Sequence, residues 1–206
     1  MKRLRAYALL VLLCSMLLSF AAMAKEGDGV RARLAKPALL RGEFAQEKQL
    51  HGFRNPLKSS GDFLLLRDRG IAWNTRAPFA SSTRLTRRKL LATMPDGSTR
   101  VLINASASPG MAAVNSLLMA LVAGDLDALA TRFTLKETLR GDAAWSLALQ
   151  PRDAALKQAF SSIVLDGDRY VRGVEIVEPG GDRTRIRFAA LREAPPATRA
   201  EAAQLD

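Results

Sequence analysis

Short segments of alternating apolar and polar residues, separated by turn residues, constrain the fold of this chain more than any other feature. The clearest example is a strand expected over residues 62–67, a tight turn over 68–70 and a returning strand over 71–75. Gly70 supplies a turn conformation that residues with a Cβ resist. The pattern predicts an antiparallel hairpin, because strands joined by so short a turn must run in opposite directions.

The first strand of this hairpin has two different faces. Alternation places Phe63, Leu65 and Arg67 on one face, and Leu64 and Leu66 on the other. Arg67 is therefore a charged residue at the end of an apolar row. It is either a strand end in water or a polar group with a specific partner.

The same pattern continues along most of the chain, with turns rich in glycine, proline and aspartate between the alternating runs. Further strands are expected at 40–50, 82–87, 89–94, 99–103, 133–140, 144–150, 161–165, 170–178 and 184–191. A meander of roughly nine to eleven antiparallel strands twists and curls, so we expect a barrel or half-barrel. The fold class is mainly β with inserted α.

Helical signals are confined to a few places. Apolar residues recur at helical spacing over 111–122, after a Ser-Pro-Gly start at 108–110. Gly124 ends this helix, and Asp125 can cap a second one over 126–132. This helix pair could cover the open mouth of the sheet. Less regular segments, expected as a short helix or extended arm and as one or two helical turns, lie at 29–40 and 151–159.

The two ends of the chain differ from its body. Residues 1–24 combine a basic start, an apolar run and the small-x-small pattern Ala22-Met-Ala24, which predicts a cleaved signal peptide; an uncleaved membrane anchor is the alternative. The single cysteine, Cys14, lies in this segment, so the mature chain has none. Residues 25–192 are expected to form one domain, and the proline-containing tail 193–206 to be disordered.

The chain is basic, with 31 lysine and arginine residues against 20 acidic ones. Three of the basic residues lie in the signal segment, so the mature chain carries a net charge of about +8. Scattered charges and few aromatic residues argue against nucleic acid as a partner. The cluster Arg84, Arg87, Arg88 and Lys89 is either a solvated edge or a docking site for acidic proteins or anionic lipid.

No catalytic or metal-binding pattern is evident. His51 is the only histidine, and no nucleophile elbow, phosphate loop or dinucleotide fingerprint is present. The acidic pairs near 166–168 and 181–182 lie between alternating runs, where aspartate and glycine form hairpin turns rather than calcium sites. We therefore expect a protein without enzymatic activity, cofactor or metal.

Several short motifs resemble the periplasmic outer-membrane lipoprotein carrier family LolA, and this chain looks like a divergent branch of it. The motifs are Phe44-Ala-Gln46, Gly61-Asp62 at the start of a strand, Arg67 at its end and Trp73 at the close of the hairpin. Signal peptide, size, meander, inserted helices and late strands also occur in the family's order. The resemblance therefore covers most of the mature chain.

The resemblance implies an unclosed β-barrel with a helical lid and an apolar cavity that shields acyl chains. It further implies a monomeric carrier in the periplasm of a Gram-negative bacterium, with a donor complex at the inner membrane and an acceptor at the outer membrane. By motif position, Arg67 would latch the lid, although Asp68 stands where the family has proline. The candidate cavity residues are Phe44, Phe63, Leu65, Ile71 and Trp73 from the strands, and Leu117, Leu118 and Leu121 from the lid.

Three other functions remain open at this point. Divergence from the family's main pattern favours a carrier of a free lipid, glycolipid or polyene-type product almost as strongly as a lipoprotein carrier. A structural or interaction domain would instead have a filled barrel. A lipid hydrolase would need a nucleophile motif that the sequence does not contain.

Overall fold

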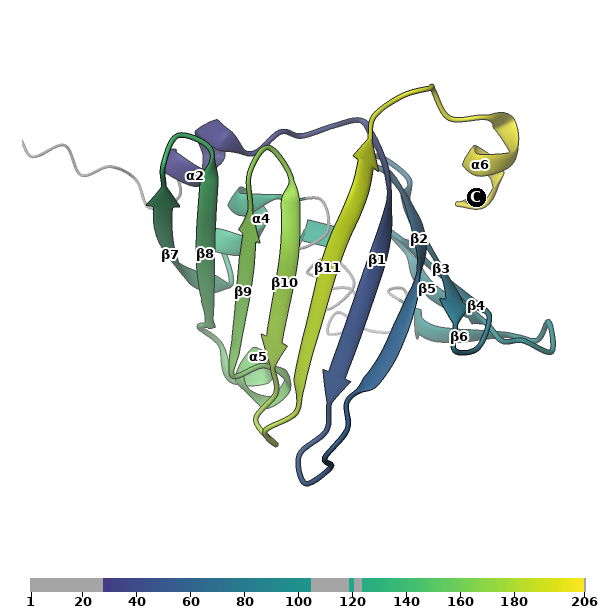
Figure 1. Ribbon diagram of the computed structural model, residues 1–206, viewed down its shortest axis with the longest axis horizontal. Helices are drawn as coiled ribbons and strands as arrows, with labels where there is room; N and C mark the ends of the chain where they lie inside the picture. The colour runs from purple at the N-terminus through teal and green to yellow at the C-terminus, as the bar shows by residue number, and fades with distance from the viewer. Residues whose placement is uncertain (1–27, 105–118, 121–123, 206) are drawn as a thin grey trace, which may run out of the picture.

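The computed structural model describes residues 28–104, 119–120 and 124–205 (Figure 1). Its strands form one antiparallel sheet of eleven, in the order β6-β5-β4-β3-β2-β1-β11-β10-β9-β8-β7. The sheet is not closed, because its two outermost strands, β6 and β7, do not pair with each other. The predicted mainly-β, unclosed architecture is therefore confirmed.

Most element boundaries lie close to those expected from the alternation, but the strand expected over 62–67 begins five residues earlier, at Leu57. The strands before the helical block are β1 (Leu39–Gln49), β2 (Leu57–Leu66), β3 (Gly70–Ala77), β4 (Ser81–Thr86), β5 (Lys89–Thr93) and β6 (Thr99–Asn104). Those after it are β7 (Phe133–Arg140), β8 (Ala144–Pro151), β9 (Ser162–Gly167), β10 (Val171–Val177) and β11 (Arg183–Arg192). The described helices are α2 (Asp28–Arg33), α4 (Leu126–Ala130), α5 (Ala154–Ala159) and α6 (Arg199–Ala203).

Some expectations fall on residues that are not described. The signal peptide lies within residues 1–27, so it stays a prediction. Of the longer lid helix expected over 111–122, only Met119 and Ala120 are described, and both are helical. None of the helices within the described ranges is long and apolar enough to cross a membrane.

Two meanders of neighbouring strands make up the sheet. One runs from β1 to β6 and the other from β7 to β11, and they join where β1 pairs antiparallel with β11 (Figure 1). At this seam Phe44 lies opposite Phe188, and Glu47 lies opposite Arg185. The strands that come first and last in the sequence, β1 and β11, therefore lie side by side in the middle of the sheet.

The hairpin of β2 and β3 forms as predicted. Phe63 lies opposite Trp73, and Leu65 lies opposite Ile71. Gly70 has a φ of 152°, and a Cβ placed there would lie 2.0 Å from the carbonyl oxygen of Leu85 on β4. Glycine is thus required by the close approach of a third strand as well as by the turn.

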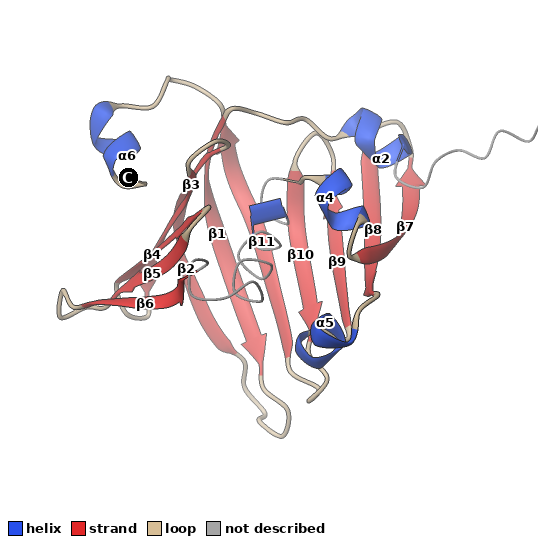
Figure 2. Ribbon diagram, turned by 180° about the vertical axis from the view of Figure 1, so that it is seen from behind, coloured by secondary structure: helices blue, strands red, loops and turns tan. Residues whose placement is uncertain are grey.

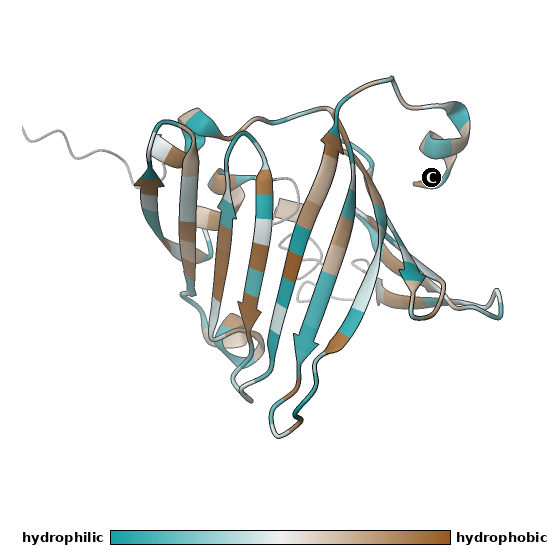
Figure 3. Ribbon diagram, viewed as in Figure 1, coloured by the Kyte–Doolittle hydropathy of each residue, from teal (hydrophilic) through white to brown (hydrophobic). Residues whose placement is uncertain are grey.

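The sheet has an apolar inner face and a charged outer face. Helices α2, α4 and α5 lie on the inner face (Figure 2), and hydrophobic and hydrophilic residues alternate along β10 and β11 (Figure 3). On the outer face, Arg185 pairs with Glu175 at 2.7 Å, and Arg187 pairs with Asp166 at 2.8 Å. Alternation therefore separates the packing surface from the solvated one.

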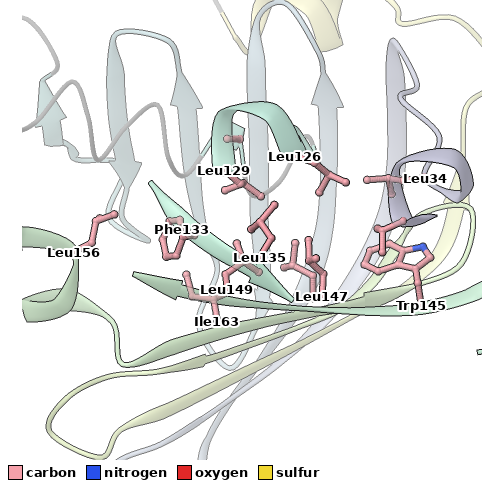
Figure 4. Packing of buried hydrophobic residues seen from close by; sticks show 13 residues of the cluster. Leu34, Leu126, Leu129, Phe133, Leu135, Trp145, Leu147, Leu149, Leu156 and Ile163 are labelled. Carbon is pink, nitrogen blue, oxygen red and sulfur yellow. The ribbon is translucent and has the colours of Figure 1, made fainter. Parts of the chain in front are cut away.

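The largest core covers the inner face of β7 to β10. Trp145, Leu147 and Leu149 of β8 pack with Ile163 of β9 beneath the helices (Figure 4). Leu126 and Leu129 of α4, Leu156 of α5 and Val30 of α2 complete the cluster. The predicted cap of α4 is confirmed, since the Asp125 carboxylate accepts a hydrogen bond from the Ala128 N–H at 3.2 Å.

The prediction of a disordered C-terminal tail is wrong for the described residues up to Leu205. Thr198 and Glu201 form a capping box at the start of α6, and the Arg41 Nε donates to Glu201 at 2.7 Å. Leu205 is only 5% exposed and packs against Leu39 and Leu64 on the outer face of the sheet. One apolar anchor and one partly exposed charge pair order a segment whose composition alone suggests disorder.

Candidate functional site

An apolar cavity lies on the inner face, where the two meanders meet. Its volume is about 150 Å³. The strand residues that line it are Leu40, Phe63, Leu65, Trp73, Val171, Val174, Ile176, Ile186 and Phe188. Gly124 and Tyr170 also reach it, as do Leu34, Ala35 and Pro37 from the segment before β1. The Tyr170 hydroxyl and the Trp73 indole N–H are the polar side-chain groups among these residues.

Four aromatic rings from four strands gather on the inner face beside this cavity. Trp73 of β3 stacks on Phe44 of β1, with ring centroids 3.8 Å apart and an interplanar angle of 27°. Phe188 of β11 contacts Phe63 of β2 edge-on at 5.3 Å, with the rings inclined at 70°. Such pairs contribute about 0.5–1.5 kcal/mol beyond the area they bury. The seam pairing of β1 with β11 brings Phe188 into the group.

The segment between α2 and β1, residues 34–37, covers part of the cavity. The Ala35 N–H donates to the carbonyl oxygen of Arg169 at 2.8 Å, which ties the segment to the turn between β9 and β10. Leu34 packs directly on Gly124. A Cβ added at Gly124 would lie 2.8 Å from the Cδ2 atom of Leu34. We call residues 34–37 the cover segment.

Charged and polar groups surround Tyr170 at the rim of the cavity. Its hydroxyl donates a hydrogen bond to Glu193, which raises the pKa of Tyr170 and lowers the pKa of Glu193. The guanidinium groups of Arg169 and Arg172 lie 5.6 and 5.7 Å from the ring centroid, within cation–π range. The cavity is thus apolar within and polar at this edge.

The family of the chain follows from comparison with known proteins. The family model described as outer membrane lipoprotein carrier protein LolA-like matches residues 19–205. The chain belongs to this family. Membership indicates a carrier-type function, consistent with an apolar cavity beside a short cover segment.

Several solved structures are similar to this LolA-like protein, at low sequence identity and with TM-scores below 0.5. A DUF1329 family protein from Desulfovibrio piger is 13% identical, with a TM-score of 0.48, covering 86% of this chain and 96% of that chain. The LolA superfamily protein NE2245 from Nitrosomonas europaea is 8% identical, with a TM-score of 0.43 and coverages of 82% and 92%. MucB in a MucA/MucB complex from Pseudomonas aeruginosa is 16% identical, with a TM-score of 0.42 and coverages of 82% and 55%. Comparison with curated proteins finds no matching sequence.

The structure brings together the strand residues that the sequence singled out. Phe63, Leu65 and Trp73 line the cavity of the LolA-like protein, while Phe44 stacks behind Trp73 and Ile71 is buried in the same cluster. The lid residues Leu117, Leu118 and Leu121 lie outside the described residues. Lipid binding by any of these residues stays a prediction.

Arg67 lies one residue beyond the end of β2 and is exposed. Its N–H donates to the carbonyl oxygen of Ala38 at 3.0 Å, and its side chain lines a surface recess with Met119, Ala120 and Asp125. Within the described residues, its guanidinium makes no hydrogen bond. Asp68 pairs with Arg87 at 3.5 Å rather than with Arg67. The latch role of Arg67 stays a prediction.

Sequence reasoning missed the second wall and the cover. Val174 and Ile176 of β10 and Ile186 and Phe188 of β11 alternate in the way that was recognised for these strands. No spacing signal shows that β11 pairs with β1, however, and the pairing is what places these side chains in the cavity. The cover segment likewise has no periodicity of its own.

The described residues offer no metal site, since no three histidine, cysteine, aspartate or glutamate side chains come together among them. His51 lies exposed in the loop between β1 and β2, where its backbone N–H donates to Asp182 at 2.8 Å. The apolar lining of the cavity supports the burial of apolar groups.

Proposed function

We propose that this protein is a non-enzymatic periplasmic carrier that shields the acyl chains of a lipoprotein during transfer toward the outer membrane. It would act as a monomer between a donor complex at the inner membrane and an acceptor at the outer membrane. The observation that carries the proposal is the apolar cavity at the seam, with aromatic rings on one wall and a thin cover segment above it. Family membership supports it.

The volume of the cavity bears on how cargo would enter. At about 150 Å³ it is smaller than the roughly 300–1,000 Å³ of pockets that enclose drug-sized ligands. It can therefore take part of one acyl chain, and a longer chain requires the cover segment to move. The contact of Leu34 over Gly124 and the bond from Ala35 to Arg169 would break in that step.

The free energy of acyl burial favours an opening of the cover segment that is coupled to cargo entry. Burying acyl carbons contributes about 0.8 kcal/mol per CH₂, so a sixteen-carbon chain contributes about 12 kcal/mol. A carrier that kept all of this free energy would hold several chains too tightly to release them. If contacts of the cover segment and the lid break when an acyl chain enters, their loss offsets part of the burial free energy. The same contacts form again when the chain leaves, which favours release.

The two tryptophans allow a direct test of cargo placement. Trp73 lines the cavity, whereas Trp145 is buried in the core of the other meander. A brominated fatty acid should quench the tryptophan fluorescence of the Trp145→Phe variant saturably, and quench that of the Trp73→Phe variant much less. Each variant retains one tryptophan, so each is the matched control of the other. Absence of saturable quenching in both would contradict the carrier proposal.

The second test concerns Arg67 as a latch. An arginine that holds lid carbonyls would contribute about 1.5–3 kcal/mol to the closed state. Arg67→Leu should therefore leave fatty-acid affinity unchanged or tighter and slow transfer to acceptor vesicles. Arg54→Leu, an exposed arginine in the loop between β1 and β2, is the control. Equal transfer rates in wild type and Arg67→Leu would remove Arg67 from the mechanism.

A free single-chain lipid is a second candidate cargo, and the small cavity favours it. A lipoprotein anchor carries several acyl chains, which demand more space than about 150 Å³. Mass spectrometry of lipid retained after gentle purification distinguishes the two. A free fatty acid, glycolipid or polyene-type product would replace the lipoprotein as cargo and leave the carrier mechanism unchanged.

A further inference from the structure

The two free edges of the sheet are built differently. On β7, Lys136, Glu137 and Arg140 place charges along the strand, and α2 packs against its end. The Val30 N–H donates to Glu137 at 2.9 Å, and Arg33 donates to the carbonyl oxygen of Gly141 at 2.7 Å. Charged residues and a covering helix are the usual means of preventing an edge strand from pairing with another chain.

Strand β6 has few of these protections. Val101 is 56% exposed and Leu102 is 54% exposed, and Arg100 is the one charged residue of the strand. β5 pairs with one side of β6, and no described strand pairs with its other side. An apolar edge with unpaired backbone groups is a template for an additional strand.

The strands next to this edge carry an excess of positive charge. Residues 81–104 contain Arg84, Arg87, Arg88, Lys89 and Arg100, against a single acidic residue, Asp96. Of the basic residues, only Arg87 forms an ion pair within the described part of the chain, with Asp68. Arg183, Arg185 and Arg187 of β11, in contrast, are paired with Glu175 and Asp166. We call β4, β5 and β6 together the basic wing.

We propose that β6 is a docking edge for an acidic, extended segment of a partner protein, which adds to the sheet as a further strand. Backbone hydrogen bonds along the edge would supply affinity, and apolar side chains of the segment would pack against Val101 and Leu102. Its carboxylates would meet Arg100 within β6 and Lys89, which lies opposite Asn104 at the end of the strand. Charge complementarity would also accelerate the encounter.

The same charge disfavours a second copy of this chain at the edge. Pairing β6 with β6 of another copy would bring two basic wings together, and like charges on neighbouring strands are destabilising. An acidic partner meets no such repulsion. The charge pattern thus selects the chemistry of the partner, while the backbone edge selects its extended conformation.

Docking at β6 leaves the cavity accessible. Two strands separate β6 from β3, the nearest strand that lines the cavity, so the two sites lie about 14 Å apart across the sheet. A partner on the edge and cargo in the cavity could therefore be bound together. The edge would serve to position the protein against a partner without occupying the space that holds its ligand.

The test uses a fluorescent peptide of alternating glutamate and valine with the complete mature protein. The wild type should bind it saturably, and affinity should fall at least tenfold for the same peptide N-methylated at alternate residues, which cannot pair with an edge. A lysine–valine peptide should not bind. Arg100→Glu should weaken binding about tenfold, whereas Arg140→Glu on the opposite edge should leave it unchanged. Equal melting temperatures of the two variants exclude misfolding as the cause.

Four outcomes would overturn the proposal. Equal binding of the N-methylated peptide would show electrostatic attraction without strand addition. Binding to phosphatidylglycerol vesicles but not to the peptide would assign the basic wing to a membrane surface. Concentration-dependent dimers that disappear in Val101→Lys would assign the edge to a second copy. No binding to any of these probes would leave β6 without a docking role.

Discussion

The two halves of the sheet differ in how they fill their inner face. Across β7 to β10, the described helices α2, α4 and α5 pack on the strands, and Trp145, Leu147 and Ile163 are almost completely buried. Around the seam, the inner side chains of β1 to β3 on one side and of β10 and β11 on the other face a cavity instead. The strands under the helices are therefore a filled scaffold, which we call the filled half, and the strands from the seam to β3 border a cavity, which we call the hollow half. A carrier needs both, because a rigid wall allows a thin cover to move without loss of the fold.

The largest expected effect comes from breaking the filled half. Leu147→Ala removes a fully buried side chain from the core beneath α4 and should destabilise the protein by about 2–5 kcal/mol. Leu65→Ala is the matched change in the hollow half, where the side chain already borders a cavity, and should cost about half as much. Urea unfolding measures both. Equal losses would show that the two halves are packed alike.

An intermediate effect is expected from adding a methyl group at Gly124, beneath Leu34 of the cover segment. Gly124 has a φ of 62°, and a Cβ there would reach Leu34, whereas Gly141 has a φ of 50° with open space around it. Alanine at either position should cost about 1 kcal/mol through backbone strain. Only Gly124→Ala should also displace Leu34 and accelerate fatty-acid uptake, measured by stopped-flow fluorescence. The same uptake rate in both variants would separate Leu34 from cargo entry.

The smallest effect concerns the C-terminal contact on the hollow half. The hydrogen bonds from Arg41 lower the pKa of Glu201 to about 2, below its unfolded value near 4.5. A lowered pKa stabilises the fold above pH 4.5, and this contribution, about 1 kcal/mol for a partly exposed pair, is lost as the pH falls toward 2. Hydrogen exchange at pH 5 and pH 3 should show β1 to β3 loosening before β7 to β10. Glu201→Gln should remove that difference.

Local signals account for the parts of the fold that the sequence predicted. The hairpin of β2 and β3 depends on alternation over a few residues and on Gly70, which no other residue can replace beside Leu85. The cap of α4 depends on Asp125 and the left-handed Gly124 that precedes it. Each of these features is determined by neighbours in the chain, so a reading of spacing and residue type recovers it.

Long-range contacts account for the parts that were missed. Alternation marks Phe188 as inward-facing but does not reveal that Phe44 lies across from it. Nothing in the tail's composition indicates that Leu205 finds Leu39 and Leu64, or that Glu201 meets Arg41. The cavity was predicted with one wall because the second wall depends on pairing between distant strands.

The seam between β1 and β11 also has a consequence for folding. It pairs residues near position 45 with residues near position 187, whereas β1 meets β2 through one short loop. Closing so long a loop carries a large entropy cost, and contacts between distant residues form slowly. During synthesis, before β11 has left the ribosome, β1 has one unpaired edge and the cavity lacks the residues that β11 contributes. β11, the last strand in the sequence, joins the two meanders and brings the second wall to the cavity at the same time.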